Sequence, residues 1–452
     1  MASLKWNDEF LNLMREEGDP VADTAAKVLW ENRDRNIIDD IKYISKNHHM
    51  PVDISLVEGL HIDFSDEDLA KLEYYFKSTD RLNIAITEED KKQFEIYAKV
   101  FEQYGFVIVS LLFFKSLPTG YMCPKPSKVL HSTRLLEEFA ARRVMETAQF
   151  IFAVSTPDWY MPDKKGIESI QKVRLMHAGM RYALLNNTNP DRKWDQSVFG
   201  IPINQEDMVF TNLLFSVAII EGLDQFGINL TDEERRAFVH TWKMIGLALG
   251  ISEQLMPDSL EDAHDLYRAI YDRNVTEDNA YGPDLTKALL SAMNEITGMP
   301  LKQTTLEDLT LYLIYDSKVF KSLGLHTPSV WARILASIIQ LFFAGKKWRN
   351  FSEREASGFI SKWVNKLGNA FLRYKFDLTS FLEKHPNEPP LVAFSKTILS
   401  QLHQRDLSNF IKTPDRKKDF FIDAKLFEAW GLGGFHLDED PANPKSSPPV
   451  SE

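Results

Sequence analysis

Apolar residues recur along most of the chain with the spacing of one helix face. No sustained alternation of apolar and polar residues bounded by hairpin turns is present to predict a β-sheet. Residues 6–50 are polar with a short apolar stripe per turn, which predicts an N-terminal helical layer. Residues 65–77 and 87–103 open with Ser or Thr followed by acids, the usual composition of a helix start. Residues 96–115 are almost wholly apolar, as expected of a helix buried on all sides.

Turn signals divide the rest of the chain. Between residues 131 and 255, helical patterns alternate with runs rich in Pro, Asn, Asp and Gly, which predict loops. The helical pattern continues to about residue 430, with apolar faces near 306–316, 329–344, 358–374 and 391–403. The last residues are rich in Gly, Pro, Ser and acids, a composition typical of disorder.

These patterns predict an all-α, largely single-domain protein with four parts. We expect an N-terminal helical layer at 1–125 and a central core at 126–255. C-terminal helices at 256–430 are expected to pack on that core, and a disordered tail is expected at 431–452.

Composition narrows the class of protein. The 452 residues, 44% of them hydrophobic and 12% aromatic, can bury a large core. The formal net charge of −12 argues against a nucleic-acid partner, because a phosphate backbone requires a basic face. A single cysteine, Cys123, excludes an internal disulfide framework and a Cys-rich metal site.

No segment has the pattern of a membrane span or an export signal. Residues 1–30 are charged and mixed, without the apolar core of a signal peptide. The longest apolar stretches, 106–114 and 331–345, are shorter than the roughly 20 residues needed to span a bilayer. We therefore expect a cytoplasmic protein without a transmembrane segment.

One histidine stands out on a predicted helix. On a period of 3.6 residues, His177 shares a face with Ile170, Val173, Met180 and Leu184, so its imidazole is expected to point into apolar surroundings. The simplest interpretation is a core histidine whose ring is satisfied by a backbone carbonyl.

Two further segments give His177 a context. The run 142–147 (RRVMET) lies thirty residues upstream and the run 200–207 (GIPINQED) follows shortly downstream. Together with residues 172–182, which contain His177, they resemble the family that joins the rubber oxygenases, or latex clearing proteins, to the fungal oxygenase MpaB. The resemblance covers the central part of the chain.

The resemblance implies a b-type haem in the central helix bundle. His177 would be the axial ligand of the iron, and Arg143 and Thr147 would help to build the haem pocket. Without a C-x-x-C-H motif the haem would be bound non-covalently. Ala178 and Gly179 leave the helix surface beside His177 nearly bare, as a flat macrocycle would need.

Charged residues near these positions have two interpretations each. Arg143 and Thr147 share one helix face, where the arginine needs an anion: a haem propionate, or a carboxylate such as Glu146. Arg174 and Arg181, which flank His177, are expected either to bind propionates or to form surface ion pairs.

Glu146 departs from the best-known rubber oxygenase pattern, which has a lysine there that can cap the haem. A carboxylate at that position is a candidate distal acid or base for bound oxygen, and Glu138 is a second candidate. A solvated glutamate on a helix face explains either one equally well.

The run 204–207 also has two interpretations. Asn204 and Asp207 have the spacing of a helix cap. Alternatively, Asp207 would orient His177 through its second ring nitrogen, as outer carboxylates do for metal-bound imidazoles.

The function implied by the resemblance is a haem b-dependent oxygenase. It would use dioxygen to attack a carbon–carbon double bond in an apolar, isoprenoid-like or unsaturated-lipid substrate. Met145, Met176, Met180 and Phe215 are candidates for shaping the substrate cavity, although such residues at helical spacing are more often plain core. The alternative is a helical haem-binding or interaction protein without turnover. The chain has no H-E-x-x-H, P-loop, G-x-G-x-x-G or G-x-S-x-G motif that would favour another enzyme class.

Overall fold

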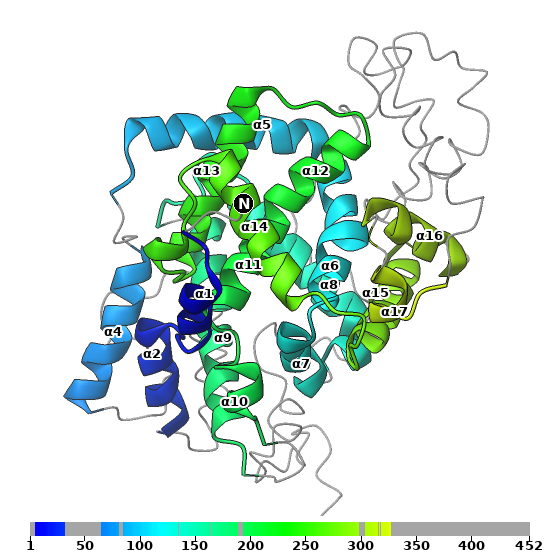
Figure 1. Ribbon diagram of the computed structural model, residues 1–452. Helices are drawn as coiled ribbons and strands as arrows, with labels where there is room; N and C mark the ends of the chain where they lie inside the picture. Colours follow the sequence, from blue (N-terminus) through cyan, green and yellow to red (C-terminus); the bar gives the residue numbers. More distant parts are fainter. Residues whose placement is uncertain are drawn as a thin grey trace, which may run out of the picture.

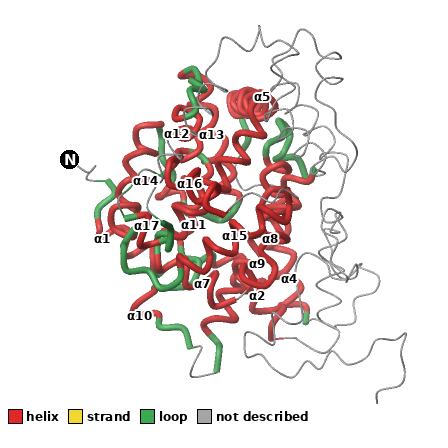
Figure 2. Tube along the Cα trace, turned by 90° about the vertical axis from the view of Figure 1, so that its right-hand side faces the viewer, coloured by secondary structure: helices red, strands yellow, loops and turns green. Residues whose placement is uncertain are grey.

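All regular structure in the described part of the chain is helical. The computed structural model describes residues 5–31, 65–80, 85–133, 135–162, 164–188, 193–297, 303–314, 316 and 318–326. No strand occurs within these ranges (Figure 2), so the predicted all-α class is confirmed. The described residues do not include the apolar faces predicted near 329–344, 358–374 and 391–403, or the tail at 431–452.

The helices vary from one turn to more than six turns in length. In chain order they are α1 (Asp8–Arg15), α2 (Pro20–Glu31), α4 (Asp66–Asp80), α5 (Glu88–Leu111), the π-helical turn η2 (Leu112–Ser116), α6 (Leu117–Tyr121), α7 (Pro124–Thr133), α8 (Leu135–Val154), α9 (Lys165–Leu185), α10 (Gln196–Phe199), α11 (Gln205–Phe215), α12 (Val217–Gln225), α13 (Asp232–Ala248), the 3₁₀ turn η4 (Glu253–Leu255), α14 (Leu260–Asn274), α15 (Gly282–Thr297), α16 (Gln303–Leu313) and α17 (Val319–Ser322).

Short-range caps fix where several helices begin. Thr87 before α5 and Thr231 before α13 form capping boxes with the third residue of their helices, Asp90 and Glu234. Each box satisfies two backbone N–H groups that the first helical turn leaves without intrahelical partners. Both starts predicted from Ser or Thr followed by acids are confirmed, because α4 begins directly after Ser65 and α5 directly after Thr87.

The main core lies beneath α5, which runs along the top of the molecule in Figure 1. The segments Glu88–Gly105 and Val107–Tyr121 are inclined at 78°, so the chain turns from the top of the molecule into its interior. Helix α13 packs along α5, and α15 packs along α8. Trp159 and Trp242 are among the largest fully buried side chains of this core.

A second, smaller hydrophobic cluster joins α2, α4 and the later half of α9, which lie side by side at the lower left of Figure 1. Its buried side chains include Trp30, Tyr75 and Leu184. The Tyr75 hydroxyl donates to the backbone carbonyl of Gln171 at 2.6 Å, which ties α4 to α9. Because Ile170 belongs to the main core, α9 connects the two clusters.

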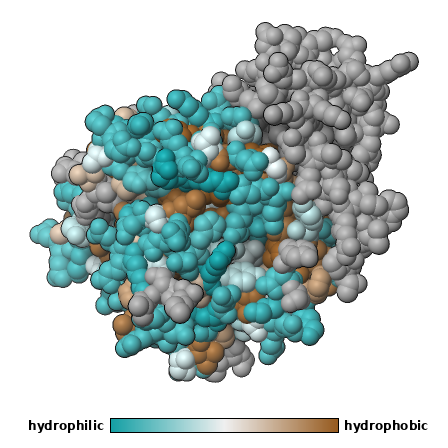
Figure 3. All heavy atoms as spheres, turned by 45° about the horizontal axis from the view of Figure 1, so that its top comes forward, coloured by the Kyte–Doolittle hydropathy of each residue, from teal (hydrophilic) through white to brown (hydrophobic). Residues whose placement is uncertain are grey.

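The surface in Figure 3 is mainly hydrophilic, with apolar residues in small areas separated by polar ones, as is usual for protein surfaces. Among the described residues, no single helix has the length and apolar composition needed to cross a bilayer. The segments Glu88–Gly105 and Val107–Tyr121 meet both criteria only as a pair, across their bend.

Candidate functional site

His177 lies near the middle of α9, on the side that the sequence pattern predicts to be apolar. Its residue is half-buried and its Nδ1 atom is buried. Ile170, Met180 and Leu184, which share its face, are all buried. Val173, the fourth residue of that face, is half-buried. The apolar face of α9 is thus present as predicted, and the role of the imidazole stays a prediction.

The small residues after His177 have a different role from the one expected of them. Ala178 is fully buried in the second cluster. A Cβ atom on Gly179 would lie 3.1 Å from the indole of Trp30 on α2. Trp30 thus fills, at this point, the space beside α9 that was expected to admit a flat macrocycle. Small residues on a helix allow a close approach, but they do not determine which group approaches.

Helix α8, which carries the other residues of the predicted haem pocket, packs against α9. Glu146 and Thr147 are half-buried on this helix. Glu138 and Arg143 belong to the same helix, but their side chains lie outside the described part of the structure. The structure thus places two of the three segments of the resemblance, 142–147 and 172–182, on neighbouring helices. The roles of these four residues stay predictions.

Arg174 pairs with an acidic residue far away in the sequence. Its Nε donates to Asp19 Oδ2 at 2.5 Å and its Nη2 to Asp19 Oδ1 at 2.8 Å, a two-point contact. Burial alone would lower the pKa of Arg174, but the hydrogen bonds and charge of Asp19 outweigh it and raise that pKa. Of the two interpretations, the ion pair is the one observed, and it is buried rather than on the surface; binding of a propionate by Arg174 stays a prediction.

Arg181 forms a second pair on the other side of His177. Its Nε donates to Asp23 Oδ1 at 2.6 Å and its Nη1 to the backbone carbonyl of Ile203 at 2.9 Å. Burial raises the pKa of Asp23, while the charge of Arg181 opposes this rise. Neither aspartate was identified from the sequence.

The run 204–207 is a helix cap. Asn204 Oδ1 accepts from the backbone N–H of Asp207 at 2.9 Å and begins α11. Asn204 Nδ2 also donates to Asp207 Oδ2 at 3.0 Å. The capping interpretation is confirmed, and the carboxylate of Asp207 contacts Asn204 and Arg15.

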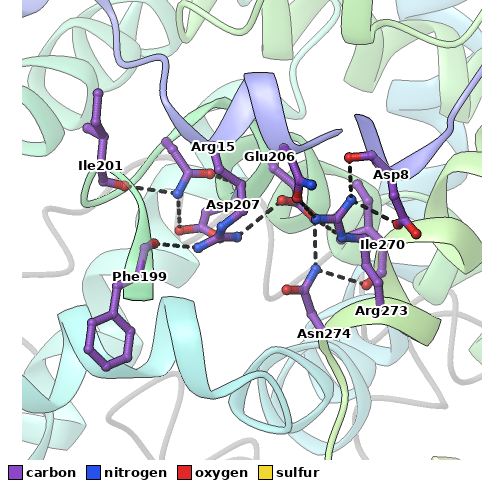
Figure 4. Close-up of polar contacts among 11 residues, drawn as sticks. Asp8, Arg15, Phe199, Ile201, Glu206, Asp207, Ile270, Arg273 and Asn274 are labelled. Carbon is purple, nitrogen blue, oxygen red and sulfur yellow. Dashed lines mark hydrogen bonds and ion pairs between the residues drawn. The ribbon is translucent and has the colours of Figure 1, made fainter. Parts of the chain in front are cut away.

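A group of charged and polar residues, which we call the Arg15 cluster, joins α1, α11 and α14 (Figure 4); it is largely buried, except for Asp8 at its edge. Its members are Asp8, Arg15, Glu206, Asp207, Arg273 and Asn274. Arg15 Nη1 lies 3.2 Å from Glu206 Oε2 and 3.1 Å from Asp207 Oδ1. Glu206, which is fully buried, also lies 3.3 Å from Arg273 Nε and accepts from Asn274 Nδ2 at 2.8 Å.

Two carboxylates share the charge of Arg15 in this cluster. The pKa of Asp207 is raised to about 6, because burial and the charge of Glu206 together outweigh the lowering by Arg15. The acids of the run 200–207 therefore hold three helices together. An acid among the apolar residues of α11 was the one available signal for this cluster, but nothing local in the sequence indicates Arg15 as the partner.

The residues proposed to shape a substrate cavity do not gather at one place. Met180 is buried in the second cluster and Met176 packs against it. Phe215 packs against the main core, where its ring lies 5.2 Å from that of Trp242. The side chain of Met145 lies outside the described part. For Phe215, the plain-core interpretation agrees with the structure.

Similarity to known proteins identifies the family to which the chain belongs. The family model for the "ER-bound oxygenase mpaB/B'/Rubber oxygenase, catalytic domain" matches residues 112–340, about half of the chain. The chain belongs to this family. The matched range begins at η2 and contains both α8 and α9.

Two individual proteins extend the comparison. A rubber oxygenase from Streptomyces sp. (strain K30) is 24% identical over 204 residues, which cover 45% of this chain and 48% of that protein. The alignment thus spans about half of the relative's length. The solved structure of latex clearing protein LCP in the closed state aligns with a TM-score of 0.57 at 19% identity, over 79% of this chain and 91% of that chain. This likeness shows a shared helical fold.

Proposed function

We propose that this protein is a haem b-dependent oxygenase that uses dioxygen to attack a carbon–carbon double bond in an apolar, isoprenoid-like or unsaturated-lipid substrate. The observation that carries the proposal is His177, buried at Nδ1 on α9 within the catalytic domain of an oxygenase family. The name of the Streptomyces relative, a rubber oxygenase, supports an apolar polymer or a related isoprenoid as the substrate class.

The residues around His177 fit a haem in chemical type. Within the described part of the chain, no group of three or more His, Cys, Asp or Glu side chains is placed to hold a metal ion. A lone imidazole is enough for a haem iron, because the porphyrin supplies four nitrogen ligands and the protein needs to add only axial ones. The buried apolar residues on the His177 face of α9 suit an apolar macrocycle.

Each residue then has a defined task. Bound haem would supply an iron centre that binds and activates dioxygen. His177 would hold the iron and tune it as an axial ligand, and Arg143 and Thr147 would fix the rest of the macrocycle. Glu146, or in its place Glu138, would hold and transfer a proton near the reacting oxygen.

A visible spectrum of the purified protein, recorded oxidised, reduced and reduced with CO, tests the cofactor. We expect about one haem b per chain, extractable with acid acetone because no cysteine pair is present to bind it covalently. His177→Ala is expected to remove or loosen the haem and to change the spectrum. His264→Ala is the matched control, since His264 is also half-buried but lies on α14. Full occupancy with an unchanged spectrum in His177→Ala would contradict the axial role.

Oxygen uptake separates an oxygenase from an inert haem protein. The reduced protein is expected to bind CO and to consume oxygen with at least one member of a panel of isoprenoids and unsaturated lipids. CO binding without oxygen uptake on any panel member would favour a haem-binding protein without turnover.

A further inference from the structure

Two ion pairs, the first of them buried, flank His177 on α9. Arg174 lies three residues before it and Arg181 four residues after it, so both are one helical turn away on neighbouring parts of the same side. Their carboxylate partners, Asp19 and Asp23, both belong to the start of α2. In the Arg174–Asp19 pair both side chains are largely buried, 12% and 3% exposed, so water screens this pair little. In the second pair Arg181 is buried, whereas Asp23 is partly open to solvent.

The two aspartates are themselves held in place by the backbone of α2. Asp19 Oδ1 accepts from the N–H of Ala22 at 3.3 Å, and Asp23 Oδ2 accepts from the N–H of Asp19 at 3.0 Å. The same carboxylates thus cap the first turn of α2 and bind the arginines of α9. A rotation of α9 relative to α2 would therefore break the ion pairs with the arginines or the hydrogen bonds of the aspartates to the backbone of α2.

A third segment closes over the Arg174–Asp19 pair. Gly250 has φ +85°, and a Cβ atom there would lie 2.2 Å from Asp19 Oδ2 and 2.7 Å from Arg174 Nε. Gln205 fixes this approach, since its Nε2 donates to the carbonyls of Gly18 at 2.6 Å and Gly250 at 3.0 Å. The pair is enclosed on a side where even a methyl group has no room.

Contact between α2 and α9 continues past the ion pairs. At the other end of α2, Trp30 lies against Gly179, two residues after His177. The start of α2 therefore contacts α9 by charge on both sides of the histidine, and the other end of α2 contacts it by close packing.

We propose that Asp19 and Asp23 are positioning residues that fix the rotation of α9, and with it the direction in which His177 presents its imidazole. This inference rests on the proposed role of His177 as a ligand. A buried ion pair often adds little net stability compared with apolar side chains of similar size, whereas it does specify one relative placement of its two elements. Two such pairs, one on each side of His177, specify the placement of the segment that a ligand requires.

Asp19→Asn and Asp23→Asn test the proposal, with Asp262→Asn as the matched control. Asp262 also anchors the N-terminal layer, because it accepts from Trp6 Nε1 at 2.9 Å, but it lies on α14. The Asp23 side chain is 36% exposed, so its variant is expected to stay folded even where Asp19→Asn does not.

Two measurements are made on each full-length variant. Hydrogen exchange of α9 peptides, without added haem, is expected to be faster in both Asp variants than in the unaltered protein and in Asp262→Asn. Haem titration is expected to show binding weakened about tenfold, the lower end of the range for residues that orient a metal ligand. The reduction potential of the bound haem is expected to shift only in Asp19→Asn and Asp23→Asn.

The outcomes separate the two ideas. Absence of haem uptake by the unaltered protein would overturn the proposed function. Uptake by the unaltered protein, with α9 exchange, affinity and potential unchanged in both Asp variants, would overturn the positioning role alone. Equal changes in Asp262→Asn would also overturn it, because they would come from loosening the whole N-terminal layer.

Discussion

At the scale of single residues, Glu146 offers the most direct test of the proposed turnover. Its carboxylate is half-buried on α8, the helix that packs against the one carrying His177. Glu146→Gln keeps the size of the side chain but removes its ability to exchange a proton. Oxygen consumption is expected to fall by roughly 10²-fold, the usual scale for losing a general acid or base, while CO binding is kept.

The control for this variant is Glu233→Gln, on the exposed first turn of α13, which should leave oxygen consumption unchanged. Intact turnover in Glu146→Gln would transfer the proton-transfer role to Glu138, which the corresponding change to Gln tests next.

Arg143 gives a second prediction at the same scale. If it pairs with a buried propionate, Arg143→Ala leaves that anion unpaired, at a cost of about 3–5 kcal/mol. Haem content after purification is expected to fall while the helical circular dichroism is largely kept. Arg235→Ala, which removes a surface pair with Asp224, is the control and should keep its haem. Unfolding without preferential haem loss would assign Arg143 to a structural ion pair.

Some of these residues could be predicted from the sequence and others could not. His177 is recognisable because the apolar face and the neighbouring motifs that identify it lie within a few dozen residues. Arg174 can be singled out in the same way, because it lies three residues before His177. Its partner Asp19, however, lies 155 residues away, and the sequence alone does not select it from the 65 acidic residues of the chain. A pattern shows that a buried charge needs a counter-charge; only the fold selects which one.

At the scale of elements, helix starts were the most predictable feature. The caps at Thr87, Thr231 and Asn204 are completed within three residues, so the information that specifies them is local. The role of Gly179 was not predictable in this way. Its missing side chain indicated a close approach, and the partner, Trp30, comes from a helix almost 150 residues earlier.

Gly250 provides a test at this scale, because it ends α13 and also covers the Arg174–Asp19 pair. Its φ of +85° is costly for any residue with a Cβ atom, by roughly 1–2 kcal/mol. Gly250→Ala adds a collision with Asp19 Oδ2, so it is expected to destabilise the protein further and to loosen the contact between α2 and α9.

Gly227→Ala is the matched control, since Gly227 ends α12 with a φ of +76° and has the same backbone cost. The midpoint of urea unfolding measures the difference between the two variants. An equal decrease of the midpoint in both variants would mean that the residues around Asp19 can move to accommodate a methyl group at little cost in stability.

At the scale of the whole molecule, polar contacts join the N-terminal helices to the catalytic domain that follows them in the sequence. Helices α1 and α2 precede the range matched by the family model, 112–340, yet Arg15 and Asp19 each form buried ion pairs with residues inside it. The sequence predicted a layer over the core from the apolar stripe alone. Ion pairs of Arg15, Asp19 and Asp23 also attach these helices to the rest of the fold.

The Arg15 cluster makes the stability of the whole fold depend on pH in a defined direction. Burial raises the pKa of Asp207 from 3.8 to about 6, so between these values the folded protein holds a proton that the unfolded chain has released. Stability from this group is therefore fully present below about pH 4 and is lost as the pH rises to about 6. A shift of about two pKa units corresponds to about 3 kcal/mol.

Asp207→Asn removes this titration while keeping the shape of the side chain. The unfolding free energy of the variant minus that of the unaltered protein is expected to increase by about 3 kcal/mol between pH 4 and pH 7, because only the unaltered protein must ionise a buried carboxyl group. Urea unfolding at a series of pH values measures this difference, in which the titration of groups that do not interact with Asp207 cancels. Asp224→Asn, which alters a surface pair with Arg235, should change stability by less than about 1 kcal/mol at every pH. A difference for Asp207→Asn that stays constant with pH would show that Arg15 keeps the carboxylate ionised throughout, and that the charge of Arg15 outweighs the cost of burial.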